Sequence, residues 1–140
     1  MSESVRFHFD VDGENFTSAG QASVQVKKNL RQLGIPAEII RRVSIAMYES
    51  EINMVIHAGG GRADVVVSES SINIILDDDG PGIADVELAM REGYSTAPDN
   101  IRSLGFGAGM GLPNMKRYTD KMDIDTAPGK GTRITMRVDM

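Results

Sequence analysis

The chain has 140 residues, a formal net charge of −5 and no cysteine. This length is enough for one domain to bury a core without disulfides, and the missing cysteines exclude thiol nucleophiles, Cys-ligated zinc and iron–sulfur clusters. The acidic balance argues against nucleic acid or an anionic membrane as a partner. Because there is no apolar leader and no apolar run long enough to cross a membrane, we expect a cytoplasmic protein.

The first predicted element is a strand over residues 5–11, because apolar and polar residues alternate there. The polar set, which includes His8, is expected to face solvent. A helix should follow from an N-cap at Thr17 or Ser18 to Leu33, just before a glycine.

A second helix is expected to follow Pro36 and to run through Ala58, before three consecutive glycines. Two strands over residues 62–68 and 71–78 are predicted to form a hairpin. Residues 83–111 show no sustained period, and so long a segment in a small domain is usually a functional lid or disordered.

The end of the chain predicts a helix over residues 112–119 and a second hairpin, in which residues 121–126 pair with 132–138. Strands and helices therefore do not alternate regularly. This order favours an α+β fold, a two-layer α/β sandwich with helices on one face of a mixed, mostly antiparallel sheet, over a doubly wound fold. We expect a single domain over residues 1–140.

The second helix carries the first group of candidate site residues. At about 100° per residue, Glu49, Asn53 and His57 lie within about 80° of one another and run down the middle of the apolar face. A buried ionised group costs several kcal/mol unless it is paired, so this stripe indicates a site. The alternative is a slightly rotated helix with Glu49 solvated at the edge of the core. The same projection points a second carboxylate, Glu51, outward.

A second candidate group lies at the end of the strand over residues 71–78. Alternation places Asp78 on the core-facing side, directly before Gly80 and Gly82. Glycines allow a ligand to approach the backbone closely. A polar turn rich in Asp and Gly is the alternative for this motif on its own.

A third group is a run of glycines at alternate positions: Gly105, Gly107, Gly109 and Gly111, followed by Leu112. Exposed backbone N–H groups that lead into a helix favour phosphate binding, and a disordered glycine loop is the alternative. The sequence contains no P-loop, Rossmann fingerprint, eukaryotic kinase motif or hydrolase nucleophile elbow.

These three motifs, in this order, resemble those of the GHKL ATPase superfamily with its Bergerat fold. The matching residues are Glu49-x-x-x-Asn53-x-x-x-His57 for the N box, Asp78-x-Gly80-x-Gly82 for the first glycine box, and the Gly105 to Leu112 run for the second. The resemblance covers nearly the whole chain. It is greatest to short serine/threonine kinases of the anti-sigma and stressosome type, and among these to RsbT-like switch kinases.

The resemblance implies an ATP- and Mg²⁺-dependent protein serine/threonine kinase. In such a kinase Glu49 acts as general base on the attacking hydroxyl, and Asn53 coordinates the Mg²⁺ that bridges the ATP phosphates. Asp78 accepts a hydrogen bond from the adenine amino group, and Thr132 supports it through its hydroxyl or a water. A lid over about residues 84–111 closes over the triphosphate. The implied nucleotide-binding residues are Asn53, His57, Asp78, Gly80, Gly82, Ile83, Gly105, Gly107, Gly109, Gly111, Leu112 and Thr132.

The implied partner is a small regulatory protein in a partner-switching signalling system. A STAS-domain protein is the expected substrate, and a phosphatase or sigma-type regulator is the alternative partner. Two other functions stay open: an anti-sigma factor that mainly sequesters a sigma factor, and a nucleotide-gated binding module without turnover. No phosphoacceptor-histidine helix precedes the motifs, so we do not expect a complete sensor histidine kinase; an isolated catalytic fragment of one is compatible with the sequence. The oligomeric state is left open.

Overall fold

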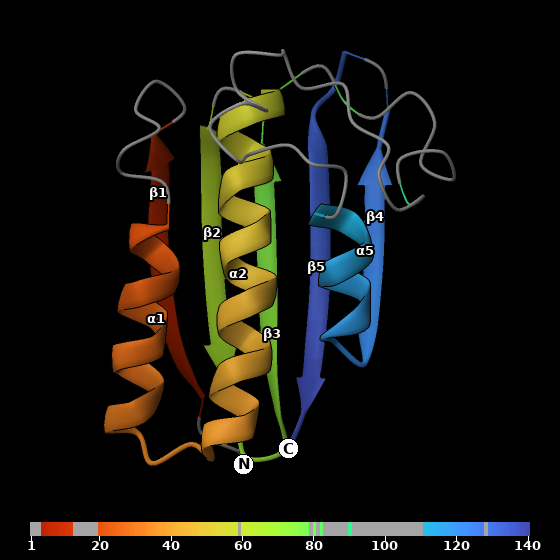
Figure 1. Ribbon diagram of the computed structural model, residues 1–140. Helices are drawn as coiled ribbons and strands as arrows, with labels where there is room; N and C mark the ends of the chain where they lie inside the picture. Colours follow the sequence, from red (N-terminus) through yellow and green to blue (C-terminus); the bar gives the residue numbers. More distant parts are fainter. Residues whose placement is uncertain are drawn as a thin grey trace.

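A layer of helices packs on one face of a five-stranded sheet (Figure 1). This computed structural model describes residues 4–12, 20–58, 60–78, 80, 82, 90, 111–127 and 129–140. The predicted lid over about residues 84–111 therefore lies almost entirely outside the described residues. No helix in the described ranges is both long enough and apolar enough to span a membrane.

The sheet has the strand order β1-β2-β3-β5-β4, and each of its four pairings is antiparallel. Its strands are β1 (Val5–Asp12), β2 (Gly60–Val67), β3 (Ser71–Asp78), β4 (Lys121–Thr126) and β5 (Thr132–Asp139). The last strand of the chain thus lies between β3 and β4. Both predicted hairpins are present, and the predicted α+β sandwich with a mostly antiparallel sheet is confirmed.

Within the described residues, three helices cover the sheet: α1 (Gln21–Gln32), α2 (Ala37–Ala58) and α5 (Gly111–Arg117). The long helix α2 lies over the middle of the sheet, and α1 and α5 flank it on the same face (Figure 1). The predicted span of α2, from just after Pro36 through Ala58, is confirmed.

The core lies between the helices and this face of the sheet, because alternate side chains of the strands point toward the helices. Buried positions in β2 and β3 follow this period of two. The fully buried large apolar side chains come from both layers: Val26, Leu30, Val43, Met47, Val65, Ile72, Ile74, Met115, Met136 and Val138. Each contributes roughly 1.5–3 kcal/mol through removal of its apolar surface from water.

Helix α1 begins later than predicted. Its first residue is Gln21, and the N-cap is Gly20, with a φ of 96° and no side-chain cap of its own. The predicted caps, Thr17 and Ser18, lie outside the described residues. A residue of α2 provides the missing cap, as described below.

Candidate functional site

Helix α2 is rotated relative to the orientation predicted from its sequence. Its buried side includes Val43, Met47 and Met54, whereas Glu49 and Asn53 are half-buried. The expectation that Glu49 and Asn53 run down the middle of the apolar face is wrong, and the edge alternative describes Glu49 better. The physical reason is that α2 packs against two helices as well as the sheet, so its buried surface is wider than one stripe. The side chain of His57 lies outside the described residues.

The prediction that Glu51 points outward is also wrong. Glu51 is only 2% exposed and caps the first turn of α1 from the side of α2. Its Oε2 accepts hydrogen bonds from the backbone N–H groups of Gly20 at 2.9 Å and Ala22 at 3.2 Å, and its Oε1 accepts one from Ser23 at 2.6 Å. These are N–H groups that a helix start leaves unpaired, and they favour a carboxylate.

Glu49 faces helix α5. The amide Nδ2 of Asn114 donates a hydrogen bond to Glu49 Oε1 at 3.3 Å. One residue further along α2, the hydroxyl of Ser50 donates to the carbonyl of Ala46 at 2.6 Å and lies 3.2 Å from the sulfur of Met115. The segment of α2 that carries Glu49 is therefore tied to α5. Sequence reasoning missed Asn114, because no local pattern links it to a residue 65 positions earlier.

Asn53 lies one helical turn after Glu49, as the N-box spacing predicts. Its side chain is half-buried. Its amide makes no hydrogen bond to any other residue that the structure describes, so its oxygen remains available to a ligand.

Asp78 lies at the end of β3, in register with Thr132 at the start of β5. Its Oδ1 accepts two backbone hydrogen bonds, from Gly80 at 3.0 Å and from Thr132 at 3.2 Å. The structure thus brings Thr132 to Asp78 and Gly80, which precede it by about 50 residues in the sequence. No hydrogen bond within the described part of the chain engages Asp78 Oδ2, which leaves this oxygen as an acceptor.

Two glycines are required by close packing around Asp78. A Cβ at Gly61 would collide with the backbone carbonyl of Asp77 and would lie 2.9 Å from the sulfur of Met54. Gly82 has a φ of 80°, and a Cβ there would collide with the carbonyl oxygen of Ala127. The end of β3 is therefore packed tightly against β2, and Gly82 is packed against the residues that follow β4.

The remaining predicted site residues are placed only in part. Gly111 begins α5, and Leu112 is buried in the core. Ile83, Gly105, Gly107 and Gly109 lie outside the described residues.

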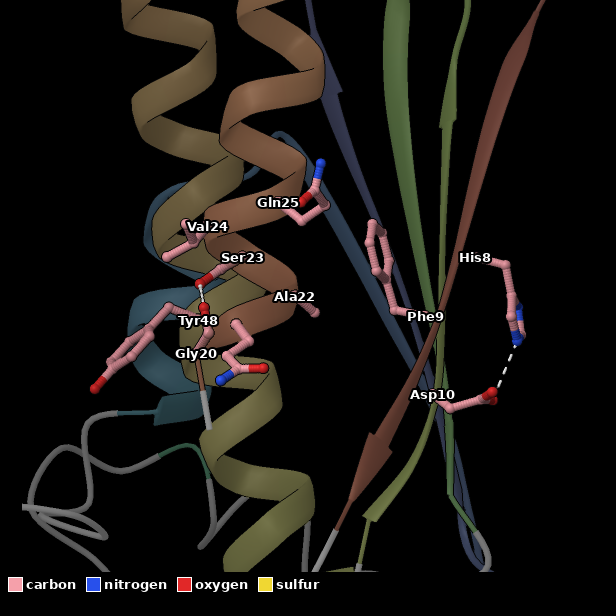
Figure 2. A pocket seen from close by; sticks show the side chains of 10 residues that line it. His8, Phe9, Asp10, Gly20, Ala22, Ser23, Val24, Gln25 and Tyr48 are labelled. Atoms are coloured by element: carbon pink, nitrogen blue, oxygen red, sulfur yellow. Dashed lines mark hydrogen bonds and ion pairs between the residues drawn. The ribbon is translucent and has the colours of Figure 1, made fainter. Parts of the chain in front are cut away.

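A pocket lies between β1 and the first turn of α1, and none of the predicted site residues lines it. Figure 2 shows Phe9 pointing from β1 toward α1, while His8 and Asp10 point to the other side of the strand. The pocket also touches Tyr48, the neighbour of Glu49 on α2.

The outward face of β1 and β2 carries a charged cluster. His8 lies 2.9 Å from Asp64 and 3.2 Å from Asp10, and Arg6 lies 3.3 Å from Asp64. The hydrogen bond with Asp64, followed by that with Asp10, raises the pKa of His8. Burial opposes ionisation of Asp64, but its hydrogen bonds with His8 and Arg6 outweigh this effect and the pKa of Asp64 is lowered.

Comparison with known proteins shows the family of this chain. A family model described as histidine kinase-, DNA gyrase B- and HSP90-like ATPase matches residues 38–140. An anti-sigma F factor of Clostridium novyi (strain NT) is 37% identical over 122 residues, which are 83% of this chain and 82% of that protein. The serine/threonine-protein kinase RsbT of Bacillus subtilis (strain 168) is 30% identical over 118 residues, 81% of this chain and 83% of that protein.

Two solved structures share the fold. The RsbU and RsbW domains of a Mycobacterium tuberculosis protein align with a TM-score of 0.64 at 16% identity, over 96% of this chain and 31% of that one. The mycobacterial sensor histidine kinase MprB aligns with a TM-score of 0.55 at 18% identity, over 96% of this chain and 97% of that one. At these identities the two structures support the arrangement of helices and strands.

Proposed function

Because this chain belongs to the histidine kinase-, DNA gyrase B- and HSP90-like ATPase family, we propose that its nucleotide site lies where α2, the end of β3 and the start of β5 meet. The chain is a protein serine/threonine kinase of the partner-switching type and uses ATP. The γ-phosphate goes to a serine or threonine of a small STAS-domain partner. Residues 1–140 act as one domain, with a lid over about residues 84–111.

The observation that carries this proposal is the arrangement of Asp78. Two backbone N–H groups hold Oδ1 in place, so that the carboxylate has one orientation and Oδ2 is left as an acceptor. An exocyclic amino group is the donor that fits this oxygen, and adenine carries one. Thr132, only 8% exposed, lies beside it. In this proposal Ile83 packs against the adenine ring.

The residues on α2 fit Mg²⁺. The ion prefers oxygen ligands, keeps several waters, and is commonly held by one or two protein oxygens together with substrate phosphates. The available amide oxygen of Asn53 meets this requirement. The described ranges contain no group of three or more His, Cys, Asp or Glu side chains that could hold a metal. A site made of Asn53 and the ATP phosphates does not require such a group. When held by Asn53, Mg²⁺ would neutralise negative charge on the phosphates.

Glu49 is proposed as the general base. It is half-buried, and Asn114 fixes its Oε1. Its other oxygen can therefore accept the proton of the attacking hydroxyl of the partner protein. The glycine run Gly105, Gly107, Gly109 and Gly111 closes over the triphosphate, and His57 and Leu112 support the nucleotide.

Nucleotide binding and phosphoryl transfer test the two halves of this site separately. Glu49→Gln should bind Mg-ATP as the wild type does and transfer phosphate to a STAS-domain partner at least about 100-fold more slowly, because the base is lost. Asp78→Asn should lose ATP affinity. Asp123→Asn, an exposed residue of β4, is the matched control and should leave both properties unchanged. Transfer by Glu49→Gln at the wild-type rate would refute the assignment of the base.

The similarity to an anti-sigma F factor favours a second candidate function, sequestration of a sigma factor. Co-purification from the source cell separates the two candidates. A stoichiometric complex with a sigma factor would support sequestration as the main output, whereas capture of a phosphorylated STAS-domain protein would support the kinase.

A further inference from the structure

Three side chains lie in one row across the sheet at the proposed binding site for the adenine ring. Thr126 ends β4 and pairs with Thr132 on β5, which in turn pairs with Asp78 on β3. The hydroxyl oxygens of Thr126 and Thr132 are 2.9 Å apart. The Thr126 hydroxyl also donates a hydrogen bond to the carbonyl oxygen of Gly131 at 3.2 Å. These contacts link the tip of the β4–β5 hairpin to Asp78.

The direction of the threonine–threonine hydrogen bond follows from the carbonyl of Gly131. A carbonyl oxygen only accepts, and a hydroxyl has a single hydrogen to donate. The Thr126 hydrogen is directed to Gly131, so the Thr132 hydroxyl donates to Thr126 Oγ1. The Thr132 oxygen is then left with lone pairs and no hydrogen for a ligand.

We propose that Thr126 is a positioning residue that makes the Thr132 hydroxyl a hydrogen-bond acceptor in the base site and thereby selects a 6-amino purine. This inference rests on the proposed ATP site. Asp78 Oδ2 is the second acceptor, so both side chains accept and neither donates. The amino group of adenine satisfies them, whereas the 6-carbonyl of hypoxanthine or guanine meets only lone pairs. A site that leaves its polar groups unpaired discriminates strongly against such an analogue.

The hairpin turn keeps Thr126 in this position. Lys130 N–H donates to the carbonyl of Ala127 at 3.0 Å, and Gly131 adopts a φ of 79°, which favours glycine. Gly82 packs against the same turn, close to Thr126 Oγ1 and the carbonyl of Ala127. The hairpin turn and the segment around Gly82 therefore pack against each other and hold the Thr126 hydroxyl beside Thr132.

The test compares binding of ATP and of inosine triphosphate to single and double variants. The base of inosine triphosphate has a carbonyl in place of the 6-amino group of adenine and carries a hydrogen on N1. Thr126→Val keeps the shape of the side chain and removes its hydroxyl, which frees the Thr132 hydrogen to donate to a carbonyl. The preference of the wild type for ATP should fall roughly tenfold, the value of about one hydrogen bond. Thr126→Ser should restore the preference. Thr135→Val, on the outward face of β5, is the matched control and should keep it.

A double variant distinguishes this role from a structural one. Because Thr126 acts through the Thr132 hydroxyl, adding Thr126→Val to Thr132→Val should produce no further change in the ATP-to-inosine-triphosphate ratio. Equal losses of affinity for both nucleotides in Thr126→Val, or the same change of ratio in the presence and absence of the Thr132 hydroxyl, would overturn the inference. Failure of the wild type to bind ATP at all would instead refute the proposed function.

Discussion

The carboxylate of Glu51, in the middle of α2, accepts a hydrogen bond from the backbone N–H of Ser23 at 2.6 Å and so caps a different helix. Backbone N–H groups of Gly20 and Ala22 bond to the same carboxylate. Glu51, two positions after the proposed general base Glu49, thus fixes where α1 begins. The cap links the first helix to the helix that carries Glu49 and Asn53.

We expect Glu51→Gln to destabilise the protein by about 1–3 kcal/mol, because the amide brings an NH₂ group to donors that need an acceptor and removes the favourable charge at the helix start. Urea denaturation measures the change in free energy of unfolding. Glu38→Gln is the matched control: its exposed ion pair with Arg41 should contribute little. Equal stability of Glu51→Gln and wild type would show that the cap is not needed.

Gly61→Ala should both destabilise the fold and weaken ATP binding. The added Cβ has no room beside the carbonyl of Asp77, and the backbone must shift next to Asp78, at a cost of about 1–3 kcal/mol. Gly34→Ala is the comparison. Gly34 has a φ of 76° but open space around it, so its substitution strains the backbone far from the site. It should lower stability and leave ATP affinity unchanged, and the same pattern in Gly61→Ala would contradict the prediction.

Asn114→Ala should slow phosphoryl transfer roughly tenfold with ATP affinity within about twofold of wild type, because the base loses its orientation while the nucleotide contacts remain. Single-turnover transfer and equilibrium nucleotide binding separate the two effects. Asn73→Ala, on the outward face of β3, makes the same change away from α2 and should alter neither. A parallel loss of ATP affinity in Asn114→Ala would mean that Asn114 acts on the nucleotide.

The stability contribution of His8 should decrease as pH rises. Its pKa in the folded state is raised above the ordinary value of 6.5 by Asp64 and Asp10, so the protonated form is favoured by folding. The contribution is fully present below pH 6.5 and is lost as pH rises through the folded-state pKa. Urea denaturation of wild type and His8→Asn between pH 5.5 and 8.5 measures it. A difference that grows with pH would have the wrong sign, and Asp64→Asn should flatten the dependence.

Sequence patterns predicted the strands and their facing residues well, because a period of two depends on the local backbone alone. The alternation predicted which side of its strand Asp78 and Thr132 each occupy, whereas their contact depends on the pairing of β3 with β5. The orientation of α2 was not predictable at the same level. Flanking helices bury its sides, and only the packed structure shows that Glu51 is inside while Glu49 lies at the edge. The contact of Asn114 with Glu49 likewise depends on how α5 docks.

The strand order has a consequence for the folding pathway. Asp78 and Thr132 are 54 residues apart in the sequence, and they meet only when β5 pairs with β3. Such non-local pairings form slowly, because the intervening chain must first lose entropy. A nucleotide that contacts both Asp78 and Thr132 can therefore bind only to protein molecules in which β3 and β5 have already paired. At a nucleotide concentration 100 times its Kd, this selective binding adds about 2.7 kcal/mol to the stability of the completed sheet.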